Sequence, residues 1–433
     1  MRLILFDRLA DDRLHFHPLV LSRPIWELRL GMTTLGAKLA AAARASSTAC
    51  FVPDYLAEVY RTEVDWPVND PASLRGDDLL LVDGRVKADG LAGWLEGPSR
   101  VAIDATGQLR AARVARADLA RLPGESLDAL LSAADEILPR AEEPPPTWNY
   151  VWDLVLSNAD ALRADFAAAG RQGFEGRVEE PLAVRGSRKD IYIAPGATIH
   201  PMVVLDAEHG PIYIDEGAVI HPFTRIEGPC YVGKQSILLG AKCREGNTIG
   251  PMCRVGGEVE ESIIHGYSNK YHDGFLGHAY VGQWVNLGAG TTNSDLKNDY
   301  SAVEVILDGK RAVDTGSTKV GALIGDHTKT SIGTLLNTGA YVGAMALIAA
   351  TGKPLPKFIP SFAWFLEGVV TKGFGKRALY ATARTVTQRR GCRWTEADER
   401  LWDAVHRMTA PARDDAVRRG RRAMAAGSGL GAG

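Results

Sequence analysis

The sequence predicts an α/β domain, then a parallel β-helix built from hexapeptide repeats, then a helical extension. Two observations carry this prediction. Strand-like and helix-like runs alternate over the first 140 or so residues, and from about residue 178 an aliphatic residue recurs at every sixth position. A chain of 433 residues is also long for a single core, which suggests about two or three domains.

The first domain is expected over residues 1–143. Its strand-like runs are residues 3–6, 49–52 and 79–82, and helix-like runs at residues 33–43 and 55–62 separate them. This βαβ rhythm is typical of an α/β domain. We expect a reduced version of such a domain, because about 140 residues are few for a full catalytic domain of this class.

A linker and a bridging helix are expected over residues 144–177. Pro144, Pro145 and Pro146 cannot continue a helix and predict an extended segment. After this segment, apolar residues recur at spacings of three and four, which predicts one amphipathic helix. Its apolar positions are Trp152, Val155, Ala159, Leu162 and Phe166.

The β-helix is expected over residues 178–352. A period of six fits neither an α-helix nor an ordinary strand, and it is the sequence signature of hexapeptide coils. The series are Ile193, Ile199, Leu205; Ile214, Ile220, Ile226, Val232, Leu238; Ile249, Val255; and Ile324, Thr330, Leu336, Val342, Ile348. The step is lost at residues 257–278 and 293–318, which we interpret as loops carried on a rigid scaffold.

The final segment, residues 353–433, is expected to be helical with a disordered tail. Thr395 to Asp398 matches a capping box, and a helical stripe follows it at Leu401, Trp402, Val405 and Met408. The basic run at residues 418–422 is interpreted as a solvated end.

Composition excludes several classes of protein. Fifty Lys and Arg residues against 52 Asp and Glu give a net charge of -2, which argues against a nucleic-acid or membrane partner. No apolar run is long enough to span a bilayer, and the N-terminus reads as a first strand, not a signal peptide. The five scattered cysteines indicate reduced thiols. We therefore expect a cytoplasmic protein.

One motif in the repeat region points to a known family. It runs from Asn269 through His272 to Gly282 and continues over Val285 to Thr291. This segment resembles the acetyltransferase half of the bacterial bifunctional enzymes that make UDP-N-acetylglucosamine, in register from His272 to Thr291. The resemblance implies a left-handed β-helix, an acyl-CoA substrate such as acetyl-CoA, and a homotrimer.

The same resemblance implies site residues. His272 falls on the family's general base and Asn286 on an asparagine that contacts the sugar phosphate. Contacts with acyl-CoA are expected at Gly288, Ala289 and Gly290, and further substrate contacts at Lys270, Asp295 and Lys297. The sequence departs from the family at Phe275, which replaces a tyrosine, and at Asp295 and Leu296, which replace an asparagine and a tyrosine.

A second interpretation of this segment involves a metal ion. His265, His272 and His278 could bind zinc, as in β-helical carbonic anhydrases, where three histidines hold the metal between subunits. The acidic catalytic residues of that family have no clear counterpart here. We therefore favour packing or cleft-lining roles for His265 and His278.

The N-terminal domain also resembles a family. The segment from His17 to Pro24 is similar to the Pro-Leu-Thr-x-x-Arg-Pro-Lys segment of sugar-phosphate nucleotidyltransferases. Together with residues 26–31 it resembles more closely a divergent bacterial branch, in which a reduced domain precedes a β-helix. The resemblance makes Arg23 and Arg29 candidate cations around a nucleotide, and Asp83 a candidate Mg²⁺ ligand. The family's glycine-rich loop is absent, and its lysine is Ile25.

These observations predict a transferase that acts on sugar phosphates or nucleotide sugars. It would combine a nucleotidyltransferase-like domain with a β-helical acyltransferase. The alternative is a non-catalytic or regulatory trimeric protein that binds sugar nucleotides. The missing glycine loop favours this alternative for the N-terminal half, and His272 with Asn286 favours catalysis in the C-terminal half.

Overall fold

The chain divides into two compact units. A computed structural model describes residues 1–349, 352–366, 368–373 and 375–428. Unit 1 comprises Met1–Phe16, Ser22–Leu28 and Thr33–Tyr150, and unit 2 comprises His17–Leu21, Arg29–Met32 and Val151–Gly433. Two short N-terminal segments thus belong to unit 2. The finer predicted boundaries at residues 143, 177 and 352 stay predictions.

Unit 1 is built on a five-stranded sheet with the order β4-β1-β5-β7-β6. β1 runs parallel to β4 and β5, and β7 runs antiparallel to β5 and β6. The strands of this sheet are β1 (Arg2–Phe6), β4 (Ser47–Phe51), β5 (Leu79–Asp83), β6 (Arg100–Ile103) and β7 (Leu109–Val114), and the short β3 (Thr33–Thr34) lies outside it. The helices are α1 (Leu35–Ala43), α2 (Asp54–Tyr60) and α3 (Leu127–Ile137).

The elements of unit 1 follow from local sequence. β1 and β5 are continuous apolar runs, as expected for parallel strands that are buried on both faces. Thr34 begins α1 as its N-cap, since its hydroxyl accepts from the Ala37 amide, and Ser126 begins α3 in the same way. The predicted βαβ rhythm is confirmed.

Unit 2 has two helices where the sequence predicts one. They are α4 (Val151–Leu156) and α5 (Asn158–Ala169), and they are divided at Ser157. The Asn158 side chain accepts a hydrogen bond from the Gly31 amide and donates one to the Gly246 carbonyl, each at 2.8 Å. Asn158 is fully buried. These bonds supply a reason for the division that helical spacing cannot reveal.

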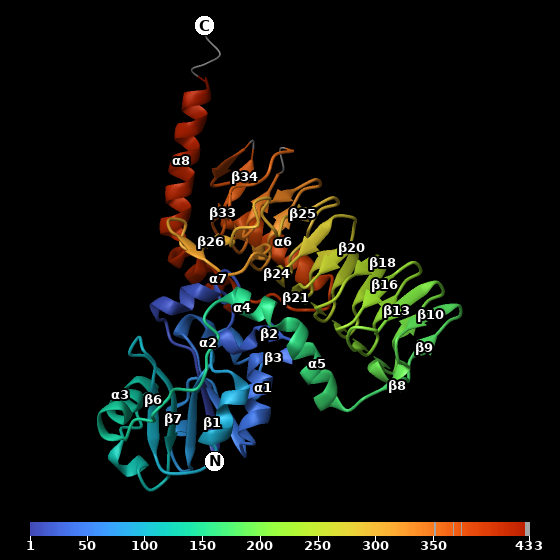
Figure 1. Ribbon diagram of the computed structural model, residues 1–433. Helices are drawn as coiled ribbons and strands as arrows, with labels where there is room; N and C mark the ends of the chain where they lie inside the picture. The colour runs from blue at the N-terminus through green and yellow to red at the C-terminus, as the bar shows by residue number, and fades with distance from the viewer. Residues whose placement is uncertain (350–351, 367, 374, 429–433) are drawn as a thin grey trace. The chain divides into compact units, whose positions relative to one another are not determined.

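The rest of unit 2 is dominated by a solenoid of short parallel strands (Figure 1). Two ten-stranded sheets and one four-stranded sheet form its walls. Its strands are β8 (Gly173–Phe174), β9 (Arg177–Val178), β10 (Leu182–Arg185), β11 (Ile191–Ile193), β12 (Thr198–Ile199), β13 (Val203–Asp206), β14 (Ile212–Ile214), β15 (Val219–Ile220), β16 (Arg225–Glu227), β17 (Cys230–Val232), β18 (Ile237–Cys243), β19 (Asn247–Ile249), β20 (Arg254–Glu260), β21 (Ile263–Gly266), β22 (Asn269–Lys270), β23 (Phe275–Gly277), β24 (Tyr280–Gln283), β25 (Thr292–Asn293), β28 (Leu323–Ile324), β29 (Lys329–Thr330), β30 (Leu335–Leu336), β31 (Tyr341–Val342), β32 (Leu347–Ile348), β33 (Phe358–Ile359), β34 (Trp364–Leu366) and β35 (Val369–Thr371), and the short β2 (Arg29–Leu30) also lies in unit 2.

The predicted six-residue period is confirmed by strand register. One column of aligned residues, one from each coil, shows it most completely, and we call it the Lys270 column. Its members are Ile199, Ile220, Leu238, Val255, Lys270, Leu287, Thr330, Ile348 and Phe365. All of them are at most 8% exposed, so the column belongs to the core of the solenoid.

The interruption predicted at residues 257–278 is wrong. β20, β21, β22 and β23 pair with their neighbours through this segment, and the core positions are Val259, Ile264, Lys270 and Leu276. Two features hid the period in the sequence. The steps from Val255 to Val259 and from Val259 to Ile264 are shorter than six residues, and a lysine occupies a position that is aliphatic in most coils.

The interruption predicted at residues 293–318 is confirmed. The chain leaves the solenoid after β25 and forms an antiparallel hairpin of β26 (Glu304–Ile306) and β27 (Ala312–Asp314). It then returns to the stacked coils at β28.

The C-terminal segment is helical, with α6 (Lys376–Gln388), α7 (Glu396–Met408) and α8 (Ala410–Ser428). The predicted capping box is present at Thr395 and Asp398. Ala416 and Val417 of α8 join the solenoid core together with Val370. Of the predicted disordered tail, the part up to Ser428 is helical, and residues 429–433 lie outside the described residues.

The predicted fold class is confirmed: an α/β domain, a parallel β-helix and C-terminal helices. None of the described helices combines the length and the hydropathy needed to cross a bilayer.

Candidate functional site

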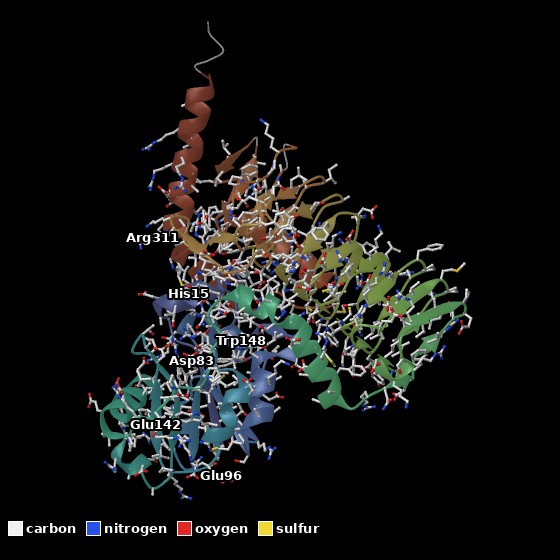
Figure 2. All side chains as sticks on the ribbon, in the orientation of Figure 1. His15, Asp83, Glu96, Glu142, Trp148 and Arg311 are labelled. Atoms are coloured by element: carbon white, nitrogen blue, oxygen red, sulfur yellow. The ribbon has the colours of Figure 1, made fainter. Side chains whose placement is uncertain are left out.

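Asp83, labelled in Figure 2, lies at the carboxyl end of β5. It belongs to a buried network of ion pairs. Its carboxylate accepts hydrogen bonds from Arg85 Nε at 3.0 Å, Arg85 Nη2 at 2.8 Å and Arg110 Nη1 at 2.8 Å. The two arginines also pair with Asp12, and Arg110 Nε donates to Asp104 at 2.6 Å. Burial raises the pKa of the Asp83 carboxyl, and the Arg85 guanidinium opposes this shift.

This network does not fit the predicted magnesium ion. Mg²⁺ needs carboxylate oxygens that can turn toward it in octahedral geometry. Both oxygens of Asp83 are already bound by guanidinium groups, Oδ1 by Arg85 and Oδ2 by Arg85 and Arg110. In the described part of the chain, no group of three or more His, Cys, Asp and Glu side chains is arranged to hold a metal ion.

Arg23 is also committed to the fold of unit 1. It is 6% exposed, and its carbonyl accepts from Arg13 Nη2 at 3.0 Å. Arg13 binds both oxygens of Asp7 at 3.1 Å, and Asp7 accepts from the Ile25 amide. These bonds fasten residues 23–25 to the end of β1.

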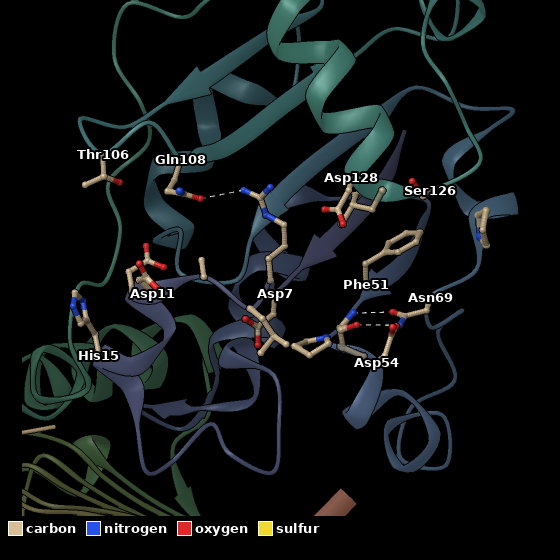
Figure 3. A pocket seen from close by; sticks show the side chains of 18 of the residues that line it. Asp7, Asp11, His15, Phe51, Asp54, Asn69, Thr106, Gln108, Ser126 and Asp128 are labelled. Carbon is tan, nitrogen blue, oxygen red and sulfur yellow. Dashed lines mark hydrogen bonds between the residues drawn. The ribbon is translucent and has the colours of Figure 1, made fainter. Parts of the chain in front are cut away.

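A cavity of about 1080 Å³ opens at the carboxyl ends of β1 and β4, and we call it the N-terminal cavity. Figure 3 shows Asp11 and His15 on one side of it and Phe51, Asp54 and Asn69 on the other. Its lining residues are Asp7, Arg8, Leu9, Ala10, Asp11, Asp12, His15, Phe51, Val52, Pro53, Asp54, Asn69, Pro71, Thr106, Gln108, Glu125, Ser126, Leu127 and Asp128. Carboxylates outnumber cations in this lining, and neither Arg23 nor Asp83 is part of it.

Arg29 lies in unit 2 and binds the β-helix. Its Nε donates to the His265 carbonyl at 2.9 Å, and its amide donates to the Tyr280 hydroxyl at 2.7 Å. Arg29 therefore fastens its own segment to β21 and β24.

A second cavity, of about 560 Å³, lies at one corner of the solenoid, and we call it the β-helix cavity. Four of the predicted site residues line it: His272, Asn286, Gly288 and Ala289. Its lining residues are Arg254, Asn269, Tyr271, His272, Asn286, Leu287, Gly288, Ala289, Thr330, Ser331, Ile332, Arg389 and Arg390. None of these described lining residues is acidic.

His272 is exposed at this corner, between β22 and β23. Its backbone carbonyl accepts a hydrogen bond from Lys270 Nζ, which lies inside the coil. Its ring lies edge-on to that of Tyr271, with 6.0 Å between the ring centroids. Asn286 occupies the next coil and accepts from Asn269 Nδ2 at 3.2 Å. A basic imidazole and a polar amide thus face one cavity.

Two arginines approach the same corner from distant parts of the chain. Arg390 follows α6 and donates to Asn269 Oδ1 at 2.8 Å. Arg254 begins β20, and burial together with the nearby Arg390 lowers its pKa. Like charges lie close together in a lining without carboxylates, which is the arrangement that an anionic ligand stabilises.

The cavity floor depends on small residues and one hydroxyl. A Cβ on Gly288 would lie 2.5 Å from the Ser331 backbone, so the close approach of the two coils requires glycine. The Thr330 hydroxyl accepts from the Gly288 amide at 2.9 Å. Gly290, the third glycine-segment residue predicted to contact acyl-CoA, is not among the lining residues of this cavity. It has φ of 73°, and its amide donates to the Asp273 carbonyl at 2.8 Å.

The remaining predicted substrate contacts lie elsewhere. Lys270 points into the coil, and Lys297 donates to Ser301 at 2.8 Å in the loop before β26. Asp295 is bound to His278, whose Nδ1 lies 2.8 Å from it, while His278 Nε2 lies 2.8 Å from Glu261. Burial opposes protonation of His278, but these carboxylates raise its pKa to about 9.

The three histidines considered for zinc have separate surroundings. His278 lies between its two carboxylates, and His265 is buried with its ring 6.4 Å from that of Tyr280. Among the described residues they form no metal-binding group.

The chain is similar to known nucleotidyltransferases in its N-terminal part. Residues 3–172 match the family model described as "Sugar nucleotidyl transferase". A bifunctional sugar-1-phosphate nucleotidylyltransferase/acetyltransferase of Sulfurisphaera tokodaii is 38% identical over 91 residues, which are 21% of this chain and 22% of that protein. The family resemblance predicted from the sequence is confirmed.

Other relatives agree with this resemblance. The bifunctional protein GlmU of Heliobacterium modesticaldum is 32% identical over 146 residues, which are 33% of this chain and 27% of that protein. GlmU of Synechococcus elongatus is 31% identical over 122 residues, 28% of this chain and 23% of that protein. The chain thus spans about a quarter of the length of the curated relatives it matches.

A solved UDP-N-acetylglucosamine acyltransferase from Arabidopsis is also similar, at 9% identity. The match covers 57% of this chain and 94% of that one, with a TM-score of 0.19. A likeness at this level adds nothing to the fold described above.

The sequence reasoning missed Arg254, Asn269 and Arg390. Only Asn269 carried a signal, since it opens the motif that contains His272. The arginines come from separate segments, and no local pattern marks them as neighbours.

Proposed function

We propose that the β-helix cavity is an acyltransferase site that moves an acyl group from acyl-CoA to the amine of a phosphate-bearing sugar. The observation that carries this proposal is the shared cavity: His272, Asn286, Arg254 and Arg390 line one space without a carboxylate. The named activities of the similar proteins support the same class of reaction.

His272 acts as the general base in this reaction. Its ring takes a proton from the sugar amine as the nitrogen attacks the thioester carbonyl. The C–N bond forms, the C–S bond breaks, and the CoA thiolate leaves and is protonated. General-base assistance of this kind contributes roughly 100- to 10,000-fold in rate.

The acceptor's phosphate is held by the arginine pair. Guanidinium groups bind phosphate through short, charge-assisted hydrogen bonds, often two at a time. Arg254 and Arg390 lack a carboxylate in the cavity lining that would compete for them. Asn286 and Asn269 line the same cavity, and their amide groups would orient sugar hydroxyls.

The N-terminal unit binds a sugar phosphate or a nucleotide without rapid nucleotidyl transfer. The match of residues 3–172 to the sugar nucleotidyl transferase family model supports binding. The occupied carboxylate of Asp83 and the acidic lining of the N-terminal cavity argue against rapid transfer. It corresponds to the binding alternative, confined to one half of the chain.

The functional form is a homotrimer located in the cytoplasm. Exposed apolar side chains support association, because they follow one another on successive coils. They are Met202 at 53%, Phe223 at 76% and Leu239 at 43% exposure. Burying such a column against a second copy removes apolar surface from water. Sedimentation as a monomer at micromolar concentration would contradict this assembly.

The test of the acyltransferase is CoA release from acetyl-CoA with amino-sugar phosphates as acceptors. We expect turnover by the wild type and a loss of at least about 100-fold in His272→Ala, with an unchanged melting temperature. His209→Ala serves as the control, since His209 lies outside the cavity lining. An unchanged rate in His272→Ala would refute the proposal.

A further inference from the structure

Lys270 is the one charged member of the Lys270 column among the described residues. Its neighbours above and below in that column are Val255 and Leu287, and Lys270 itself is 3% exposed. An aliphatic side chain would fill this position at a lower desolvation cost. The ammonium group therefore needs a reason to be there.

The ammonium group is bound to the corner that carries His272. Lys270 Nζ donates to the His272 carbonyl at 2.6 Å and to the Gly256 carbonyl of the preceding coil at 2.9 Å. These bonds fasten the turn that holds His272 to the coil beneath it. A charged donor strengthens both of them.

The neighbouring coil is built to leave space for this group. Gly257 has φ of 66°, and a Cβ there would lie 2.7 Å from Lys270 Nζ and 2.8 Å from the His272 carbonyl oxygen. Burial lowers the pKa of Lys270 to about 8, while the nearby Asp273 opposes that shift. The Lys270 ammonium group therefore remains mostly protonated at neutral pH.

We propose that Lys270 is a positioning residue, which acts from inside the β-helix by holding the backbone of His272 so that the imidazole faces the cavity. This inference rests on the proposed acyltransferase function. It replaces the substrate contact expected for Lys270 from the sequence with a role behind the cavity wall.

Lys270→Met tests the role, because methionine keeps the apolar stem and removes the charged donor. Misplacement of a reacting group by about 1 Å costs about 100-fold in rate. We expect kcat for CoA release to fall about 10- to 100-fold, KM for both substrates to change less than twofold, and the melting temperature to stay equal or rise.

Lys329→Met is the matched control. Lys329 also binds two turn carbonyls, those of Trp284 at 2.5 Å and His327 at 3.2 Å, and burial lowers its pKa to about 8 as well. It has no contact with His272 among the described residues, so its variant should keep kcat within about twofold of the wild type.

Two further measurements separate positioning from general damage. Hydrogen exchange, followed by mass spectrometry, should speed up at residues 271–275 in Lys270→Met and not in Lys329→Met. In a His272→Ala background, Lys270→Met should not reduce turnover further. An additional tenfold loss there would overturn the inference.

The failures of the two proposals are distinguishable. If His272→Ala loses turnover and Lys270→Met keeps kcat, the inference alone is overturned. If His272→Ala keeps turnover, the proposed function is overturned, and hydrogen exchange then decides by itself whether Lys270 holds the turn.

Discussion

At the scale of single residues, charge placement separates the two halves of the chain. In unit 1 the carboxylates of Asp12, Asp83 and Asp104 are bound by Arg85 and Arg110, so charge stabilises the fold. In the β-helix cavity, arginines face a lining without acids, so their charge is available to a ligand.

Arg390→Gln tests this difference. The substitution keeps a hydrogen-bond donor and removes the charge, and a hydrogen bond to a charged group contributes about 1.5 to 3 kcal/mol. We expect KM for an amino-sugar phosphate to rise about 10- to 100-fold, with little change for the same sugar without phosphate. Initial rates of CoA release measure both.

The control for that experiment is Arg384→Gln. Arg384 lies on α6, is half exposed, and pairs with Glu399 away from the cavity. Its variant should behave as the wild type. If Arg390→Gln raised KM equally for the sugar with and without phosphate, Arg390 would not bind the phosphate group.

His278 gives a pH-dependent contribution to stability. Its pKa rises from 6.5 to about 9 in the folded chain because Glu261 and Asp295 bind the protonated ring. The stabilisation is therefore complete below pH 6.5 and is lost as the pH rises through 9. At about 1.4 kcal/mol per pKa unit, its upper limit is about 3 kcal/mol.

Urea unfolding of the wild type and His278→Gln at pH 6 and pH 9.5 measures this effect. The stability difference between the two proteins should be largest at pH 6 and should shrink at pH 9.5. A difference that stays constant across this range would show that protonation of His278 contributes nothing.

At the scale of elements, the sequence predicted what depends on neighbours along the chain. The βαβ rhythm, the six-residue period and the capping box at Thr395 are local patterns, and the structure contains all three. The sequence did not predict the division between α4 and α5, where Asn158 begins α5, or the continuous coil that contains Lys270. In each, a buried polar side chain serves a distant backbone group, which no periodicity reveals.

The candidate site was predictable to the extent that one motif encodes it. His272 and Asn286 come from adjacent coils and follow each other closely in sequence, so a family resemblance could place them together. Arg254 and Arg390 meet only because the coils stack and α6 returns along them. The partners of Asp83 were missed for the same reason, since Arg110 comes from another strand.

The element α8 supplies a prediction about the end of the solenoid. An open last coil exposes its core, and a terminal cap covers it. Val417 of α8 is 3% exposed within that core. Val417→Asp should cost at least about 3 kcal/mol, because it buries an unpaired charge.

Thermal unfolding followed by circular dichroism checks this cost. Arg419→Ala is the control, since Arg419 lies on the same helix, is exposed, and forms a surface ion pair with Asp415. It should change stability by less than about 1 kcal/mol. Equal melting temperatures for both variants would mean that α8 does not stabilise the solenoid.

At the scale of the whole molecule, the chain combines a segment that matches the sugar nucleotidyl transferase family model with a β-helix that carries its own cavity. The two units differ in whether their charged side chains are available to bind a ligand. The β-helix cavity presents arginines that no acidic lining residue neutralises, whereas the buried carboxylates of unit 1 are bound by arginines. The proposed catalysis is therefore confined to one unit.

This division predicts that purified protein is slow as a uridylyltransferase. A triphosphate approaching the N-terminal cavity meets Asp11, Asp54, Glu125 and Asp128, with Arg8 as the cation among the described lining residues. Asp83 lacks an oxygen free for Mg²⁺, and no glycine-rich loop brings amides to the phosphates. Pyrophosphate release from UTP and N-acetylglucosamine 1-phosphate should stay below about 1 per second, the lower end of ordinary turnover. CoA release from the same sample shows that the protein is active, and pyrophosphate release within the ordinary range would mean that the arginine network opens to admit a metal ion.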